Sequence, residues 1–222
     1  MAIQIGFLLF PEITQLDLTG PFEILARVPD TQLSLLWKSL DPVTSGTGLT
    51  ILPTMRLADA PQFDVLVVPG GSGLIPLLGD QELLGFLRRQ AETARYVTAV
   101  CTGSLLLGAA GLLNGYAATT HWAYHELLAL CGATPVSERV VVDRNRVTGG
   151  GITAGIDFAL RLAAELCGDD TARAIQLGLE YDPCPPFHAG TPALAGPELS
   201  ARVRAWFEPA RKQYAEALTP AR

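Results

Sequence analysis

Residues 99–115, AVCTGSLLLGAAGLLNG, decide the fold that this sequence predicts. A short β-rich run at 96–100 leads directly into Cys101, and small residues then open a helical pattern at 103–113. A strand that turns at once into a helix projects the residue at the turn beyond the sheet. This is the layout of a nucleophile elbow, here with cysteine in the place of serine. Cys101 is therefore the first candidate nucleophile of the chain.

The surroundings of Cys101 in the sequence suit this role. The N-terminus of the following helix favours a thiolate, so we expect the pKa of Cys101 to lie below the value of about 8.5 for a free cysteine. Gly103 lets the backbone turn tightly, and the amide of Thr102 is placed to donate to a developing anion. The alternative interpretation is a buried, inert cysteine, which is common in protein cores.

Working outward from the elbow, strand and helix patterns alternate along the chain. Strands are predicted at 3–10, 33–39, 63–69, 96–100 and 117–120, helices at 17–27, 81–93, 103–113, 121–130, 153–167, 171–179 and 201–218, and a hairpin at 139–143 and 146–148. This alternation predicts a three-layer α/β sandwich of flavodoxin-like type, with a mainly parallel sheet and the hairpin as its antiparallel part. Active sites in such sheets lie beyond the carboxyl ends of the strands.

The domain organisation follows from length and proline content. At 222 residues, we expect one domain over 1–222 with a C-terminal helical extension from about residue 198. The proline-rich stretch 183–197 is interpreted as a loop that connects the last helix to the body.

Composition excludes several classes of protein. Hydrophobic residues make up 49% and charged residues 17%, which excludes a disordered chain. The net charge is −6 and no Lys or Arg precedes Arg27, so we expect no nucleic acid partner. Four cysteines without a CxxC pair indicate neither a disulfide scaffold nor a zinc ribbon. With no targeting segment and no apolar run of membrane-spanning length, we expect a soluble, cytoplasmic protein without a membrane partner.

Two further segments lie where strands end. VVPGGSG at 67–73 follows a buried strand, and its glycines let backbone amides approach a ligand, although a plain turn explains them equally well. The segment lacks the GK[ST] of a P-loop. FPEITQLDLTGPFEIL at 10–25 places Asp17 between the first strand and a helix. Asp17 is either the N-cap of that helix or a carboxylate near Cys101, and the residues alone leave both open.

These three segments, in this order, resemble the ThiJ/PfpI superfamily, whose fold is like that of class I glutamine amidotransferases. The resemblance spans about residues 3–179. It implies that Cys101 is the reactive cysteine, that Asp17 bonds it, and that the Gly71 amide helps to form an anion site. The PfpI-like peptidases carry a histidine base directly after the cysteine, where this chain has Thr102. A cysteine protease needs a base within hydrogen-bond reach, so peptidase chemistry is not expected.

Within the superfamily the chain is most similar to the isocyanide hydratases, on segments 10–25, 99–113, ATTHW at 118–122, TGGGITAGIDFAL at 148–160 and LEYDPCPPFHAG at 179–190. The resemblance implies conversion of an isocyanide and water to an N-substituted formamide, without a cofactor. Cys101 attacks the isocyanide carbon, Asp17 manages the proton, and water releases the formamide from a thioimidate. Thr102 assists in positioning the substrate or the water.

The same resemblance suggests where the substrate binds. Gly150, Ile152 and His121 are assigned to the substrate and anion site with Gly71. We expect the N-substituent to face an apolar pocket lined by Ile152, Trp122 and Phe187. His121 and His125 are four residues apart, a spacing that can bind a metal, but no third ligand follows the pattern of a known site. No metal is therefore assigned.

Other functions use the same features. A glyoxalase-type or deglycase-type enzyme would use the same thiolate, and a redox sensor needs only an exposed cysteine of low pKa. A ligand-binding regulatory module, as in AraC-type regulators, needs a helix-turn-helix domain of about 100 residues, which we do not expect here.

The expected partner besides the substrate is a second copy of the chain, since family members are commonly dimeric and helices 17–27 and 201–214 carry apolar stripes. Cys131 and Cys167 are interpreted as small core residues.

Overall fold

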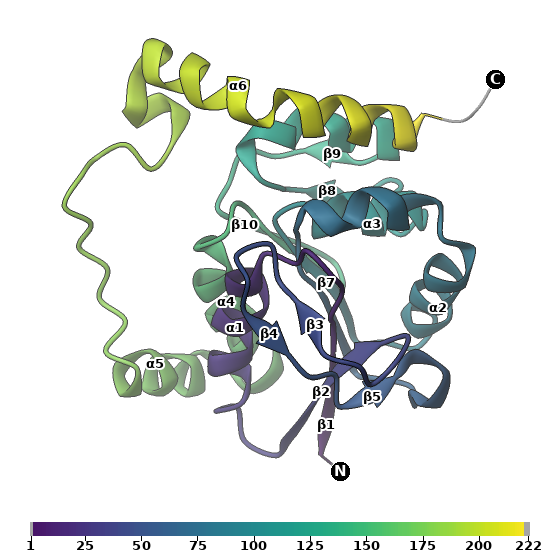
Figure 1. The fold of residues 1–222 in the computed structure, drawn as a ribbon. Coiled ribbons are helices and arrows are strands. Elements are labelled where there is room, and N and C mark those ends of the chain that lie inside the picture. Colours follow the sequence, from purple (N-terminus) through teal and green to yellow (C-terminus); the bar gives the residue numbers. More distant parts are fainter. Residues whose placement is uncertain (1, 220–222) are drawn as a thin grey trace.

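A seven-stranded sheet organises residues 2–219, the part of the chain that the computed structural model describes (Figure 1). Its strand order is β10-β11-β7-β6-β1-β2-β5. The strands are β1 (Ile3–Leu8), β2 (Thr31–Trp37), β5 (Met55–Arg56), β6 (Val65–Val68), β7 (Tyr96–Val100), β10 (Val140–Asp143) and β11 (Arg146–Gly149). Each pair of neighbours is parallel except β10 and β11, which form an antiparallel hairpin. The predicted sheet and its antiparallel part are both confirmed.

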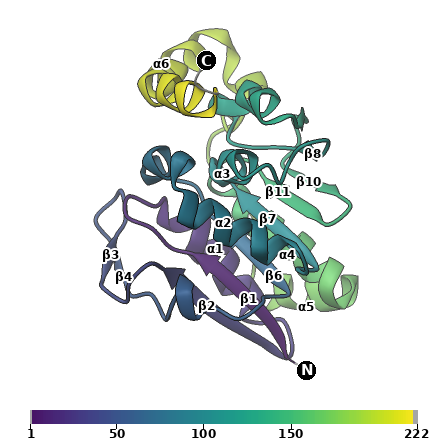
Figure 2. The ribbon, with the colours of Figure 1, turned by 90° about the vertical axis from the view of Figure 1, so that its right-hand side faces the viewer.

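Helices cover both faces of this sheet, so the three-layer prediction is confirmed as well. They are α1 (Gln15–Leu25), α2 (Gln81–Ala91), α3 (Gly103–Ala109), α4 (Ala154–Cys167), α5 (Asp169–Gly178) and α6 (Pro192–Leu218), with the 3-10 helices η1 (Leu57–Asp59), η2 (Ser72–Gly79) and η3 (Trp122–Cys131). Helices α1 and α4 pack together on one side, while α2 and α3 lie on the other (Figures 1 and 2).

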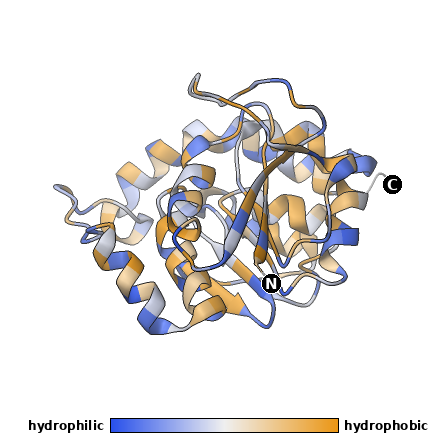
Figure 3. Cartoon of the chain, turned by 90° about the horizontal axis from the view of Figure 1, so that it is seen from below, coloured by the Kyte–Doolittle hydropathy of each residue, from blue (hydrophilic) through white to orange (hydrophobic). Residues whose placement is uncertain are grey.

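The central strands form because their residues suit burial on both faces. All four residues of β6, VLVV, are buried, and β7 is buried from its second residue onward. Continuous apolar runs of this kind are typical of parallel strands between two helical layers. In the view of Figure 3 much of the orange lies in the interior of the molecule, while the surrounding helices alternate between blue and orange. The hydrophobic core therefore lies on both sides of β1, β6 and β7.

Several short elements were not predicted from the sequence. The two-residue strands β3 (Val43–Thr44) and β4 (Thr50–Ile51) pair with each other, and β9 (Thr134–Pro135) pairs with β8 (Ala117–Ala118), which is the first half of the strand predicted at 117–120. Strands of two residues carry no alternation that a sequence pattern can reveal. The helix predicted at 103–113 ends at Ala109, and turns at 110–115 replace its last residues.

The interpretation of 183–197 as a loop is wrong for its second half, because α6 begins at Pro192. The Thr191 hydroxyl accepts a hydrogen bond from the Leu194 amide, and a proline in the first turn needs no donor there. The helix then bends at Gly196, whose φ is 77°. From there α6 runs over η3 and η2, at the top of Figure 1. Among residues 2–219, no helix combines the length and the apolar character needed to cross a membrane.

Candidate active site

Cys101 stands at a strained turn between β7 and α3. Its φ is 56°, a left-handed conformation that residues other than glycine rarely adopt. Surrounding hydrogen bonds hold it there: the Cys101 amide donates to the carbonyl groups of Gly149 at 3.1 Å and Gly150 at 2.9 Å. The Thr120 hydroxyl donates to the Cys101 carbonyl at 2.6 Å. Strain of this kind persists only where the surroundings determine it, and it is common at active sites. The predicted elbow geometry is confirmed.

Two glycines allow the elbow to pack against the end of β6. A Cβ atom at Gly103 would lie 2.0 Å from the Val68 carbonyl oxygen, which no side chain tolerates. A Cβ atom at Gly70 would lie 2.7 Å from the Thr102 amide nitrogen and 2.8 Å from Asp17 Oδ2. The missing side chains therefore let the carboxyl ends of β6 and β7 meet around one small space.

Asp17 reaches this space from the first turn of α1. It is fully buried, and its Oδ2 accepts a hydrogen bond from the Gly70 amide at 3.0 Å. The N-cap residue of α1 is Thr14, so the structure excludes the N-cap interpretation of Asp17. Among the described residues, Asp17 Oδ1 has no well-aligned hydrogen-bond partner. Burial raises the pKa of Asp17 to about 7, opposed by smaller lowering effects from hydrogen bonds with the Cys101 side chain and Gly70.

Burial also raises the pKa of the Cys101 thiol, and the negative charge of Asp17 adds to this effect. The backbone amides of Thr102 and Ile152 act in the opposite direction, as donors to the sulfur. The prediction of a lowered pKa is therefore wrong. Helix α3 has only seven residues and the cysteine is 6% exposed, so desolvation outweighs the helix end. Ionisation of one partner opposes ionisation of the other, so the titrations of Cys101 and Asp17 are coupled.

A hydrogen bond connects Thr102 and Gly71. The Gly71 amide, which was expected to help form an anion site, donates to Thr102 Oγ1 at 3.1 Å and is therefore already engaged in a hydrogen bond. Of the backbone groups near Cys101, the amides of Thr102 and Ile152 are the donors that stabilise negative charge on the sulfur. The sequence analysis assigned Ile152 to the site but did not identify its amide as a donor. The glycines at 149–151 carry no side chains over the backbone that leads to Ile152, and this was the sequence signal that could have pointed to its amide as a donor.

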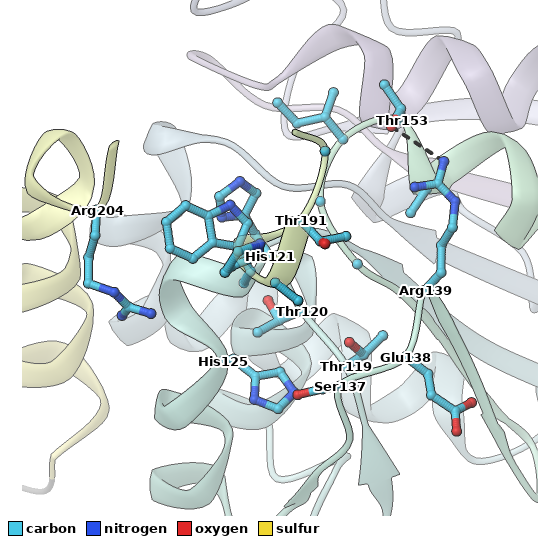
Figure 4. A pocket seen from close by; sticks show the side chains of 18 of the residues that line it. Thr119, Thr120, His121, His125, Ser137, Glu138, Arg139, Thr153, Thr191 and Arg204 are labelled. Atoms are coloured by element: carbon cyan, nitrogen blue, oxygen red, sulfur yellow. Dashed lines mark hydrogen bonds between the residues drawn. The ribbon is translucent and has the colours of Figure 1, made fainter. Parts of the chain in front are cut away.

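A cavity of about 780 Å³ lies beside the elbow, between η3, the loop after β11 and the start of α6 (Figure 4). Its lining combines apolar and polar side chains: Thr119, Thr120, His121, Trp122, His125, Glu126, Ser137, Glu138, Arg139, Ile152, Thr153, Thr191, Pro192 and Arg204, with the backbone at 150–151. It adjoins the elbow through Thr120 and Gly150, both of which hydrogen-bond the Cys101 backbone, while Cys101 and Asp17 are not among its lining residues. The expected pocket residues Ile152 and Trp122 do line it. Phe187 does not, because it is 79% exposed on the proline-rich loop.

His121 lines the same cavity as a neutral ring. Burial lowers its pKa to about 4, so the ring is neutral at physiological pH. Its Nδ1 accepts a hydrogen bond from the Ala123 amide at 3.3 Å, and its ring packs against Phe207 with centroids 4.9 Å apart. Within residues 2–219, no three His, Cys, Asp or Glu side chains are grouped to hold a metal ion.

The structure adds one group to the site that the sequence analysis missed. Tyr214 of α6 is 1% exposed, and its hydroxyl donates to the Gly71 carbonyl at 2.8 Å. In the sequence this tyrosine is one apolar member of a helical stripe, and nothing marks it as a partner of a loop 143 residues earlier. Of the predicted site residues, Cys101, Asp17, Thr102 and Gly71 meet at the elbow, Gly150 and Ile152 separate it from the cavity, and His121 lies in the cavity wall.

Comparison with known proteins identifies a family, two related proteins and a similar solved structure. The DJ-1/PfpI family pattern matches residues 3–165 of this chain. The isonitrile hydratase of Pseudomonas putida is 63% identical over 195 residues, which cover 88% of this chain and 86% of that protein. The HTH-type transcriptional regulator GbdR of Pseudomonas aeruginosa PAO1 is 36% identical over 189 residues, which cover 81% of this chain but 51% of the regulator. Among solved structures, a THiJ/PfpI family protein from Pseudomonas syringae superposes with a TM-score of 0.95 at 42% identity, covering 98% of this chain and 91% of that one.

Proposed function

The chain belongs to the DJ-1/PfpI family, and from this premise we propose that it is an isonitrile hydratase. It adds water to an isocyanide and releases an N-substituted formamide. The observation that carries the proposal is the buried pair of Cys101 and Asp17, which supplies a nucleophile and a proton at one point. The 63% identity to an isonitrile hydratase over 88% of the chain supports the same reaction.

The first step uses both members of the pair. The terminal carbon of an isocyanide, R–NC, accepts a nucleophile and a proton at the same atom. Cys101 Sγ forms a bond to this carbon, Asp17 takes the thiol proton and delivers it there, and the product is the thioimidate R–N=CH–S–Cys101. With a pKa of about 7, Asp17 is suited to accept and return a proton at neutral pH.

The second step consumes water. A water oxygen adds to the thioimidate carbon, the nitrogen gains a proton, and a tetrahedral intermediate R–NH–CH(OH)–S–Cys101 forms. The carbon–sulfur bond then breaks, the hydroxyl proton passes through Asp17 to the sulfur, and R–NH–CHO leaves. The amides of Thr102 and Ile152 stabilise the sulfur as it takes up negative charge. The sum is one isocyanide and one water converted to one formamide.

The N-substituent of the substrate extends toward the cavity beside the elbow. Its volume of about 780 Å³ exceeds what a small alkyl group requires. Trp122 and Ile152 offer apolar contact to the substituent, and Gly150 contributes backbone without a side chain at the boundary with the elbow. His121 shapes the wall as a neutral ring.

Parallel assays separate this reaction from the alternatives. The purified protein is given an alkyl isocyanide in one assay and methylglyoxal in another, and formamide and lactate are measured by mass spectrometry. We expect formamide, with no loss of activity after treatment with a chelator. Lactate without formamide would favour the glyoxalase-type alternative. Neither product would favour the ligand-binding module, to which the 36% identity with a transcriptional regulator gives some support.

We keep three further expectations as proposals. The first is a homodimer. Most apolar side chains of α1 pack inside the protomer, but Trp206 of α6 is 69% exposed and, with the exposed Leu40, Leu49 and Leu52 around the β3–β4 ribbon, supports a dimer. A monomeric mass in light scattering at micromolar concentration would contradict the homodimer.

The second of these proposals is a single domain over 1–222 with a C-terminal helical extension from about 198. The third is a cytoplasmic location, which suits the four free cysteines.

A further inference from the structure

Tyr214 joins the C-terminal helix to the reactive centre. It lies outside residues 3–165, the part of the chain that the family pattern matches. Its side chain is buried, and its hydroxyl donates to the Gly71 carbonyl at 2.8 Å. The phenol ring packs edge-on against Tyr124, with centroids 5.3 Å apart. Burial raises the pKa of Tyr214 further above its usual value, so the hydroxyl remains a donor at any physiological pH.

Gly71 is held at both of its backbone polar groups. Its carbonyl accepts from Tyr214 and from the Leu74 amide at 3.2 Å, while its amide donates to Thr102 Oγ1 at 3.1 Å. The φ of Gly71 is 148°, and a Cβ atom there would lie 2.6 Å from the Glu12 carbonyl oxygen. These hydrogen bonds and close contacts therefore hold the Gly71 backbone in a single orientation.

Thr102 connects this arrangement to the sulfur. It is the residue directly after Cys101, and its own amide stabilises negative charge on Cys101 Sγ. The Thr102 side chain also lowers the pKa of Tyr214, against the larger effect of burial. Gly71 thus links Tyr214 to Thr102, because its carbonyl accepts from the phenol and its amide donates to the Thr102 hydroxyl.

We propose that Tyr214 is a positioning residue for the cysteine chemistry. Its hydroxyl fixes Gly71 and Thr102, and through them it fixes the Thr102 amide that faces Cys101 Sγ. It does not touch the reacting atoms itself. The proposal uses the hydratase activity for one of its two measurements only, because the reactivity of Cys101 can be followed without an isocyanide.

The test compares two Tyr→Phe variants that each remove one hydroxyl. Tyr214→Phe removes the contact with Gly71. The control, Tyr96→Phe, removes a hydrogen bond from Tyr96 to Glu165 Oε2 at 3.4 Å, at the opposite end of β7 from Cys101. For each variant, kcat and KM for formamide production are measured, together with the pH profile of iodoacetamide alkylation at Cys101 and the melting temperature.

We expect Tyr214→Phe to lower kcat about tenfold with KM within about twofold, the size of effect that the loss of one hydrogen bond produces. The alkylation midpoint should move to higher pH, because a displaced Thr102 amide no longer stabilises the thiolate. Tyr96→Phe should leave both unchanged. Wild-type kcat and alkylation midpoint in Tyr214→Phe would overturn the proposal, even with a lower melting temperature, since Tyr214 would then only anchor α6.

Thr102→Val provides a second route if Tyr214→Phe folds poorly. It removes the hydroxyl that accepts from the Gly71 amide, so it should raise the alkylation midpoint in the same direction. Adding Tyr214→Phe to Thr102→Val should then change alkylation by less than about twofold, since coupled residues are not additive. A full further effect in the double variant would overturn the proposal. A shifted midpoint in a protein that makes no formamide would instead contradict the hydratase function alone.

Discussion

The two ends of β7 contrast sharply, although only five residues form the strand. At the amino end, Tyr96 is partly exposed in ordinary extended backbone and bonds Glu165 across the surface. Just beyond the carboxyl end, Cys101 adopts a φ of 56° beside a fully buried carboxylate whose Oδ1 has no well-aligned partner among the described residues. Strain and a buried carboxylate reduce stability, and this protein carries both at the carboxyl end of β7, where the candidate active site lies.

The largest effect is expected where the elbow excludes any side chain. In Gly103→Ala, the added methyl group meets the Val68 carbonyl oxygen, and the backbone must move. We expect a loss of at least about 3 kcal/mol in the free energy of unfolding, with loss of turnover. Gly79→Ala is the control, since no atom lies within 4 Å of a Cβ at that position. Equal unfolding midpoints for the two variants in urea would contradict the packing described for the elbow.

The next effect is a dependence of stability on pH that comes from Asp17. The pKa of Asp17 is about 7 in the folded protein and about 4 in the unfolded chain, so the folded state binds the proton more tightly. This contribution is therefore fully present below about pH 4 and is lost as the pH rises to about 7. The loss amounts to as much as about 4 kcal/mol, at 1.36 kcal/mol per pKa unit.

Asp17→Asn removes the titrating group and should flatten this part of the profile. Urea unfolding at pH 4.5, 6 and 8 measures the effect. Wild type should lose more stability than the variant between pH 4.5 and pH 8. Parallel profiles for the two proteins would mean that burial does not raise the pKa of Asp17, and the proton transfer proposed for it would lose its basis.

A smaller effect is expected when a hydrogen bond at the elbow and one within β7 are removed in turn, and only the bond at the elbow should affect turnover. Thr120→Val removes the donor to the Cys101 carbonyl, and Thr98→Val removes an equally buried hydrogen bond to the Leu66 carbonyl at 2.8 Å. Each variant should cost about 1–2 kcal/mol of stability. Turnover should fall only in Thr120→Val, because only that bond supports the strained residue. A matching fall of kcat in Thr98→Val would show that the strand as a whole, rather than its carboxyl end, tunes the site.

The smallest effect is expected at Cys167. The sequence analysis interpreted it as a core residue, but it is exposed near the end of α4, which corrects that interpretation. Cys167→Ala should therefore change neither melting temperature nor formamide production beyond experimental error. A marked loss of turnover would indicate a thiol role that this site does not include.

Sequence patterns predicted the parts of the molecule that depend on neighbouring residues. The strand and helix around Cys101, the hairpin at β10–β11 and the position of Asp17 after β1 all follow from local alternation and from the topology of parallel sheets. The choice between N-cap and active-site carboxylate for Asp17 needed the structure, because the Gly70 amide that it bonds is 53 residues away. Tyr214 escaped prediction for the same reason.

The electrostatics of the site were the least predictable part. The helix start after Cys101 suggested a lowered thiol pKa, but burial and the charge of Asp17, which is 84 residues away in the sequence, raise it, and no local pattern brings these together. Likewise the Gly71 amide looked available for an anion until the Thr102 hydroxyl was found to accept from it. The candidate reactive residues could be named from the sequence, whereas the burial that shifts their pKa values could be described only from the packed structure.

One measurement tests the central claim most directly, namely formamide production from an alkyl isocyanide by wild type, Cys101→Ala and the control Cys167→Ala. Each folded protein is incubated with substrate at pH 7, and the N-alkyl formamide is quantified by mass spectrometry. The account predicts formamide from wild type and Cys167→Ala, and essentially none from Cys101→Ala, because no other group at the elbow forms the covalent intermediate. Formamide production by folded Cys101→Ala at a rate near that of wild type would contradict it.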